Sequence, residues 1–157
     1  MSQDELDRLR TVADYQFGAG AGAALFPPNE AFEVTRSTSG RPRQVRAEAG
    51  RIVSYGTNGR FTLGLEGGRR LVASLAAPSA RVVVGSESEP FVRDGKNVFA
   101  KFVRSVDDDV RPNDEVAVVH ADGDVLAVGR AEIAADAMRD FETGMAVKVR
   151  AGSEPAD

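Results

Sequence analysis

Short segments of alternating polarity, each bounded by a tight turn, constrain the fold of this chain more than any other feature. They fill residues 33–65, where apolar and polar side chains alternate with a period of two. Such a period predicts strands that bury one face. Turn pairs such as Asn58-Gly59 separate the segments, and this dipeptide favours a two-residue hairpin. The predicted strands are residues 33–36, 44–47, 52–55 and 61–65.

A helix is expected on each side of this meander. Ser2 and Glu5 have the spacing of a capping box, and apolar residues follow at helical intervals, which predicts a helix over residues 2–13. The glycine-rich stretch 17–26 is compatible either with a second short helix that packs closely on its neighbours or with a loop. A glycine pair then ends the last strand, and residues 70–75 predict another short helix.

The segment 76–79, which contains Pro78, is the expected boundary between two domains. The predicted division is a first module at residues 1–77, a second at 80–151 and a flexible tail at 152–157. In the second module the expected strands are 82–84, 98–103, 115–119, 125–130 and 146–149, and the expected helices are 86–93 and 134–141. This order suits a small closed or partly closed barrel. The expected fold class is therefore α+β, with a helix-plus-β-meander module followed by a small β-barrel with flanking helices.

Composition excludes several classes of protein. The absence of cysteine excludes disulfides and thiolate metal sites. No apolar run approaches the roughly 20 residues needed to span a bilayer, and the polar, acidic start differs from a signal peptide. We therefore expect a cytoplasmic protein without a membrane partner. The bias of seventeen arginines against three lysines suggests a salt-adapted or high-GC organism.

The charge of the chain is distributed unevenly. The net charge is −4, which at first sight disfavours a nucleic-acid partner. Residues 1–78 nevertheless carry a net charge of +2, whereas residues 79–157 carry −6. Residues 36–51 contain five arginines and one acidic residue. Because a phosphate senses charge within a Debye length of about 10 Å, this local excess matters more than the total.

Candidate catalytic and metal-binding residues are few. His120 is the only histidine, and without cysteine it cannot build a usual zinc site, so we interpret it as a hairpin residue. Residues 107–109 are three aspartates without the spacing of a calcium loop, which favours a solvated acidic loop. Gly18, Gly20 and Gly22 do not match a phosphate-binding loop. No nucleophile, base and oxyanion donor come together, so we predict no catalytic residues, no metal and no cofactor.

Two basic motifs point towards binding. The first spans residues 93–101, where a glycine turn joins a predicted helix to a strand. Gly95 would let the backbone approach a ligand, and Arg93, Lys96 and Lys101 offer positive charge beside backbone N–H groups. Phosphate contacts of this kind position an RNA without reading its sequence. The alternative is a helix cap surrounded by solvated charges.

The second motif spans residues 36–46 and contains four arginines, Arg36, Arg41, Arg43 and Arg46. Arginine binds phosphate with a two-pronged fork and stacks on bases, which lysine cannot do. We interpret the motif as an RNA contact. A solvated hairpin is the alternative, because runs of charge usually are solvated.

Residues 80–150 resemble a PUA domain. The most specific parts are Gly95-Lys96-Asn97-Val98, the strand entry Arg111-Pro112-x-Asp114-Glu115-Val116, and Gly144-x-Ala146-Val147. The resemblance implies a β-barrel with flanking helices that places RNA, often the acceptor end of tRNA, beside the first helix, the glycine loop and the following strand. The implied contact set is Arg93, Gly95, Lys96, Asn97 and Lys101, extended by Lys148 and Arg150 on the last strand.

The first half is similar to the module that precedes the PUA domain in archaeal tRNA-guanine transglycosylases and related archaeosine proteins. Residues 13–27 and the arginine motif 36–43 carry this likeness. The large barrel with the transglycosylase aspartates has no counterpart here, so the resemblance does not transfer the catalytic chemistry.

The leading hypothesis is a non-catalytic archaeal RNA-binding protein that binds tRNA and serves the archaeosine pathway. The alternative is a protein-interaction subunit that docks onto a separate tRNA-guanine transglycosylase or archaeosine synthase. The RNA species, the nucleotide served and the oligomeric state stay open at this point.

Overall fold

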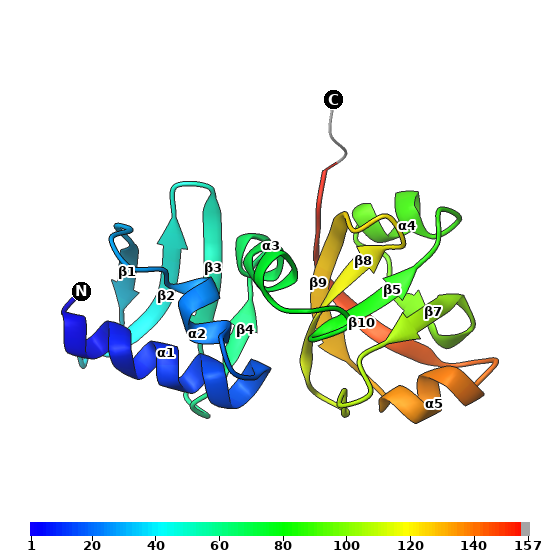
Figure 1. Cartoon of the computed structure of the whole chain (residues 1–157), viewed down its shortest axis with the longest axis horizontal. Coiled ribbons are helices and arrows are strands. Elements are labelled where there is room, and N and C mark those ends of the chain that lie inside the picture. Colours follow the sequence, from blue (N-terminus) through cyan, green and yellow to red (C-terminus); the bar gives the residue numbers. More distant parts are fainter. Residues whose placement is uncertain (155–157) are drawn as a thin grey trace. The chain divides into compact units, whose positions relative to one another are not determined.

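The computed structural model describes residues 1–154. The chain folds as two units, Met1–Leu75 and a second unit that begins at Ala76, and each is described by itself (Figure 1). Both units combine helices with an antiparallel or mixed sheet, which confirms the predicted α+β class.

The first unit is a four-stranded antiparallel sheet with three helices. The strands lie in chain order β1-β2-β3-β4, which confirms the meander. The elements are α1 (Gln3–Phe17), α2 (Ala21–Leu25), β1 (Glu33–Arg36), β2 (Pro42–Ala47), β3 (Gly50–Tyr55), β4 (Phe61–Leu63) and α3 (Leu65–Ser74).

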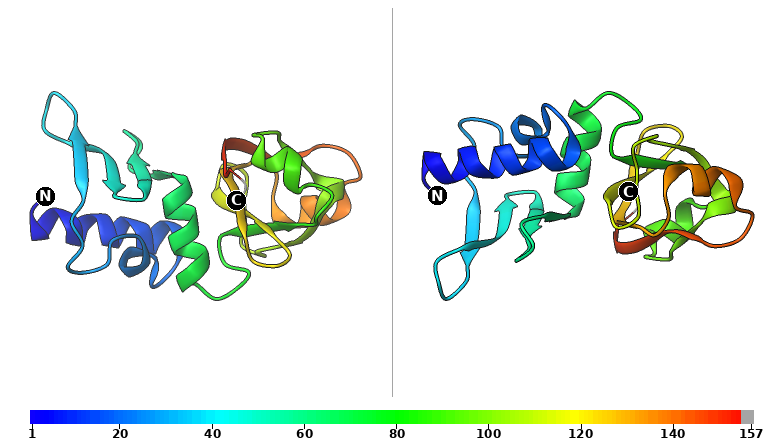
Figure 2. Two further views of the ribbon diagram at one scale, coloured as in Figure 1. Left: turned by 90° about the horizontal axis from the view of Figure 1, so that it is seen from above. Right: turned by 90° about the horizontal axis from the view of Figure 1, so that it is seen from below.

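Helices α1 and α2 lie on the same side of this sheet in both views of Figure 2. Phe26, at the end of α2, packs edge to face on Phe61 of β4 with ring centroids 6.0 Å apart. The side-chain amide of Gln16 in α1 pairs with the backbone of Phe61, donating to its carbonyl and accepting from its N–H, both at 2.8 Å. These contacts place the core between the helices and one face of the sheet, and the other face stays open.

Glycines explain where the helices of this unit depart from expectation. Helix α1 starts with the predicted capping box at Ser2, but it continues to Phe17. In α2, a Cβ on Gly22 would lie 2.4 Å from the carbonyl oxygen of Arg10, so only glycine permits this close packing. The predicted break at Gly67-Gly68 is wrong. Both glycines are buried inside α3, because a Cβ on Gly67 would lie 2.1 Å from the carbonyl oxygen of Ile52.

The second unit is a nearly closed six-stranded barrel with the order β6-β10-β9-β8-β5-β7. Strands β5 and β8 are parallel, and the other neighbours are antiparallel. The end strands β6 and β7 follow each other in the chain, so the sheet curls back on itself. The elements are β5 (Arg81–Val84), α4 (Glu89–Arg93), β6 (Val98–Phe99), the 3₁₀ turn η1 (Ala100–Phe102), β7 (Val103–Val106), β8 (Glu115–His120), β9 (Val125–Ala131), α5 (Ala135–Asp140) and β10 (Met145–Gly152).

Small apolar side chains fill the barrel, mostly valines and alanines such as Val82, Val118 and Ala127. The single strand expected over residues 98–103 is interrupted by η1, which lets the chain turn from β6 into β7. The expected flexible tail starts too early, since Gly152 ends β10 and the buried Ser153 donates its N–H to Leu126 at 2.7 Å. Residues 155–157 of that tail lie outside the described part. Within residues 1–154, no helix is long and apolar enough to cross a bilayer.

Candidate functional site

Three exposed phenylalanines mark a groove on the second unit. Phe91, Phe99 and Phe102 leave 62%, 47% and 37% of their surfaces exposed. Together with Lys96 they line a groove of about 420 Å³, which we call the phenylalanine groove. Burying three such rings would be favourable, so their exposure on a small domain marks a binding surface.

Local structure explains why these side chains face outward. Phe91 lies on α4, which ends at Arg93 and is followed by Gly95 with φ +90°. In β6, Val98 is buried and Phe99 is exposed, as the period of a strand requires. The turn η1 then presents Phe102 to the same groove.

Lys101 lies beside this groove. Its Nζ is 5.1 Å from the centre of the Phe102 ring, a cation–π contact. It also lines a neighbouring groove of about 400 Å³ that shares Phe99 and Phe102 and includes Thr143. The structure therefore brings Gly95, Lys96 and Lys101 together, with aromatic rings between the two lysines.

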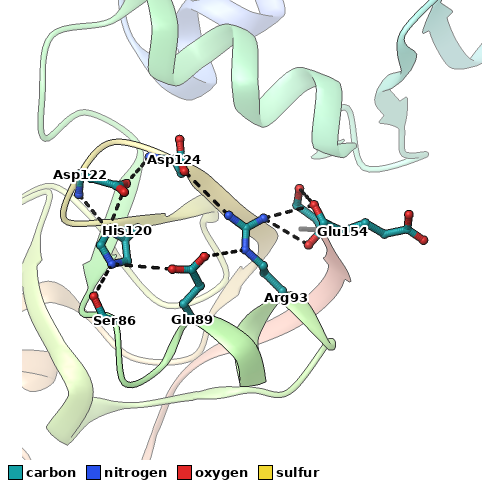
Figure 3. A network of polar contacts seen from close by, with 8 residues as sticks. Ser86, Glu89, Arg93, His120, Asp122, Asp124 and Glu154 are labelled. Atoms are coloured by element: carbon teal, nitrogen blue, oxygen red, sulfur yellow. Dashed lines mark hydrogen bonds and ion pairs between the residues drawn. The ribbon is translucent and has the colours of Figure 1, made fainter. Parts of the chain in front are cut away.

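Arg93 does not contribute a free charge to this surface, contrary to expectation. Figure 3 shows its guanidinium held by groups of the same unit. It donates to Glu89 at 2.9 Å and to the carbonyls of Ser153 and Glu154 at 3.4 and 3.3 Å, and it lies 3.9 Å from Asp124. Only 11% of its side chain is exposed. Arg93 thus fastens α4 to the end of β10.

The backbone N–H groups of the glycine loop are engaged as well. The N–H of Asp94 donates to Pro90, that of Gly95 to Val92, and that of Lys96 to Phe91. The loop is therefore a helix cap, which was the alternative interpretation of this motif. Because its backbone N–H groups are engaged, the lysine side chains are the donors left for a ligand.

Two further residues that were predicted to contact RNA, Asn97 and Arg150, form contacts within the barrel. The side-chain oxygen of Asn97 accepts the N–H of Val149 at 2.9 Å, which joins the start of β6 to β10. Arg150 forms an ion pair with Glu115, whose carboxylate is buried. Lys148, the third of these expected contacts, lies on β10 and is exposed.

His120 links α4 to the β8–β9 hairpin. Its Nε2 is 2.8 Å from the Ser86 hydroxyl and 3.8 Å from a carboxylate oxygen of Glu89 (Figure 3). The N–H of Asp122 donates to Nδ1 at 3.0 Å, and a carboxylate oxygen of Asp122 lies at the same distance from that nitrogen. These contacts tie the segment before α4 to the turn between β8 and β9. The backbone N–H of Asp124 and the nearby His120 lower the pKa of Asp122.

The four arginines of the motif 36–46 fall into two pairs. Both terminal nitrogens of Arg36 donate hydrogen bonds to the Glu5 carboxylate, at 2.8 and 2.9 Å. These bonds lower the pKa of that carboxyl to about 2. The Arg41 guanidinium lies 4.4 Å from the centre of the Tyr55 ring. Arg43 and Arg46, by contrast, are exposed and have no ion-pair partner among residues 1–154.

Sequence reasoning did not select the phenylalanines. The signal was present, since Phe99 falls on the exposed side of a strand whose other side is apolar, next to two of the three lysines of the chain. No metal-binding cluster of His, Asp or Glu occurs within the described residues.

Two family models match the chain, one for each unit. Residues 7–78 match the model described as patch-forming domain C2 of tRNA-guanine transglycosylase. Residues 80–152 match the PUA domain model.

The relatives are archaeal. The chain is 47% identical over 150 residues to a tRNA-guanine(15) transglycosylase of Methanothermobacter thermautotrophicus and 46% identical over 148 residues to that of Thermococcus kodakarensis. These matches cover 95% and 93% of this chain but 23% and 25% of the relatives, so the chain spans about a quarter of their length.

Solved structures show the same fold. A hypothetical protein of Pyrococcus horikoshii superposes with a TM-score of 0.69 at 18% identity, covering 97% of this chain and 92% of that one. A PUA domain protein of Thermoplasma acidophilum superposes with a TM-score of 0.66 at 22% identity, covering 100% and 93%.

Proposed function

We propose, from the premise that this chain belongs to the archaeal PUA-domain proteins and matches the C2-plus-PUA accessory region of tRNA-guanine(15) transglycosylases without their catalytic barrel, that it is a non-catalytic tRNA-binding protein. The PUA domain and these relatives support RNA binding linked to tRNA modification. The archaeosine pathway is the proposed setting, because the relatives are transglycosylases that act on tRNA.

The observation that carries the proposal is the phenylalanine groove between Lys96 and Lys101. Unpaired bases stack on aromatic side chains, and each stacked base contributes about 1–3 kcal/mol. The two lysines attract the phosphates on either side. Arg43 and Arg46 on the first unit would add further phosphate contacts, and Lys148 on β10 is a further candidate.

The acidic balance of the second half does not oppose this interpretation. Its net charge of −6 would repel RNA from most of the surface, but screening limits that repulsion to about 10 Å. Binding is then confined to the lysine-flanked groove, which favours a defined contact over general adhesion to nucleic acid.

The test measures the dissociation constant for an unmodified tRNA transcript at low and moderate salt. Replacing Phe99 and Phe102 with alanine should weaken binding about tenfold or more, because at least one stacked base is lost. Tyr15→Ala is the matched control, since this tyrosine is 89% exposed on α1 and should leave binding unchanged. Undetectable tRNA binding at low ionic strength would contradict the proposal.

The same acidic balance favours a second candidate, a subunit that docks onto a separate tRNA-guanine transglycosylase or archaeosine synthase. In that case the negative charge would discourage stray RNA binding. Copurification of such an enzyme in stoichiometric amount, with no RNA retained and no loss of the complex after nuclease treatment, would favour this candidate.

A further inference from the structure

The open face of the first unit carries a polar row that crosses all four strands. Thr35 of β1 pairs in register with Gln44 of β2, Gln44 with Ser54 of β3, and Ser54 with Thr62 of β4. Residues that pair in register lie side by side on the same face, about 4.8 Å apart. One amide and three hydroxyl groups therefore form a line, which we call the polar row.

This row lies opposite the core. The neighbouring row, Val34, Val45, Val53 and Leu63, is apolar, and three of its members, Val45, Val53 and Leu63, are buried. Because successive side chains alternate between faces, the polar row points away from the side where α1 and α2 pack.

The hydroxyls of the row have hydrogens to donate outward. The Thr35 hydroxyl oxygen accepts the N–H of Gln44 at 3.1 Å, and the Ser54 hydroxyl oxygen accepts from Arg51 at 2.7 Å. Each of these hydroxyl oxygens thus accepts a hydrogen bond from the protein, which leaves its hydrogen available to donate to a ligand. The side chains of Gln44 and Thr62 have no hydrogen-bond partner within residues 1–154.

Positive charge borders the row. Between Thr35 and Arg36 the pairing of β1 shifts from Gln44 to Pro42, so Arg43 is the extra residue of a β-bulge. Arg43 lines a shallow groove of about 480 Å³ together with members of the polar row. Arg46 lies on the same face as Gln44 and pairs in register with Glu33 of β1. The Glu33 carboxylate limits the positive charge on the β1 side of Arg46.

We propose that this face binds the sugar–phosphate backbone of a base-paired RNA stem, with the polar row on the 2′-hydroxyls and Arg43 and Arg46 on the phosphates. The row itself carries no aromatic ring, and the Tyr55 ring that lines the same groove already has the Arg41 guanidinium over it, 4.4 Å from its centre. The face therefore suits paired bases, whose edges stay inside the helix. A wide, shallow minor groove that displays 2′-hydroxyls is the feature by which proteins recognise double-stranded RNA. The charge fits an RNA backbone better than an acidic protein, because arginines flank a line of neutral donors and acceptors.

This inference rests on the proposed function and assigns a different part of the RNA to each of the two surfaces. The phenylalanine groove takes unpaired bases, whereas the open sheet face takes a paired stem. The row would distinguish RNA from DNA in the stem, because DNA lacks the 2′-hydroxyl.

The test uses the full chain and three probes that share one unpaired 3′ RNA tail: an RNA stem with the tail, a DNA stem with the tail, and the tail alone. The RNA stem should raise affinity over the tail, and the DNA stem should bind about three to ten times more weakly than the RNA stem. The double variant Gln44→Ala/Thr62→Val should remove this preference while its affinity for the tail alone stays the same. Arg43→Ala/Arg46→Ala should weaken both stems alike.

The matched control is Gln3→Ala/Thr11→Val, which removes an exposed amide and hydroxyl from α1 on the other face of the sheet. Its preference for RNA should equal that of the wild type, and thermal unfolding checks that each variant is folded. Equal affinity for both stems, or a preference that Gln44→Ala/Thr62→Val keeps, overturns the inference. Binding to the tail with no gain from either stem overturns it while the proposed function stands, whereas no binding to any probe removes both.

Discussion

Glu5 belongs to two interactions at once, and they can be separated by a single substitution. It completes the capping box of α1 with Ser2, and it pairs with both terminal nitrogens of Arg36. The guanidinium lowers the pKa of the carboxyl from 4.5 to about 2. Because the folded pKa lies below the unfolded one, the pair stabilises the fold above pH 4.5, and this contribution is lost as the pH falls towards 2.

Glu5→Gln should therefore change the pH profile of stability. Glutamine keeps the capping box but cannot form the ion pair. We expect the variant to melt at a lower temperature than the wild type above pH 4.5, and the difference to vanish as the pH falls to about 2. Thermal melts between pH 2 and 7 measure this, with Glu48→Gln as an exposed control. A difference that is independent of pH would show that the ion pair does not contribute.

At the scale of an element, α4 shows that a motif predicted to bind RNA can include a residue with a structural role, here Arg93. The five-residue helix is too short to hold its place alone, and Arg93 fixes it to the end of β10. The same helix carries Phe91, a wall of the phenylalanine groove. Arg93 therefore acts on the groove by positioning α4, whereas Lys96 lines the groove and is the residue that we propose to contact a ligand.

Salt dependence of tRNA binding separates these two roles. Lys96→Ala should make the dependence shallower by about 0.7 to 0.9 per lost phosphate contact. Arg93→Met should lower the free energy of unfolding by about 1–3 kcal/mol, because it leaves Glu89 and two carbonyls without their donor. Its affinity should fall, but its salt slope should match that of the wild type. A shallower slope for Arg93→Met would restore Arg93 as a phosphate contact.

Helix α3 provides a second element whose sequence misleads. Alanine favours a helix over glycine by about 1 kcal/mol at exposed positions. At Gly67 the effect should reverse, since the new Cβ would meet the Ile52 carbonyl at 2.1 Å. We expect Gly67→Ala to lower the denaturation midpoint clearly, by more than Ala73→Gly at an exposed position of the same helix. A stabilised Gly67→Ala would mean that α3 can move away from β3 at little cost.

At the scale of the whole molecule, the RNA contacts that we propose fall on two kinds of surface of an acidic chain. The second unit presents rings and lysines, and the first presents a flat polar face with arginines at its border. Neither surface requires a positive net charge, because each concentrates its cations within about one Debye length. In the larger archaeal relatives the matching region is about a quarter of the chain.

Local pattern determined much of this protein by itself. The meander, the Ser2 capping box, the β8–β9 hairpin and the division into α+β modules all follow from periodicity and turn residues. These features depend on neighbours along the chain. The PUA-type motif also predicted Lys96 and Lys101 as contact residues, and the structure places them at two adjoining grooves; that they bind RNA stays a prediction.

Only the tertiary structure decided which charges are free and which apolar side chains are exposed. Arg93 and Arg150 look like Lys96 in the sequence, but carboxylates and carbonyls from distant segments occupy them. By its residue type Phe99 would be expected in the core, but 47% of its surface is exposed in the folded barrel. The polar row also arises from pairing between strands. In each case the partner comes from a remote part of the chain, so burial and pairing are set by packing rather than by residue type.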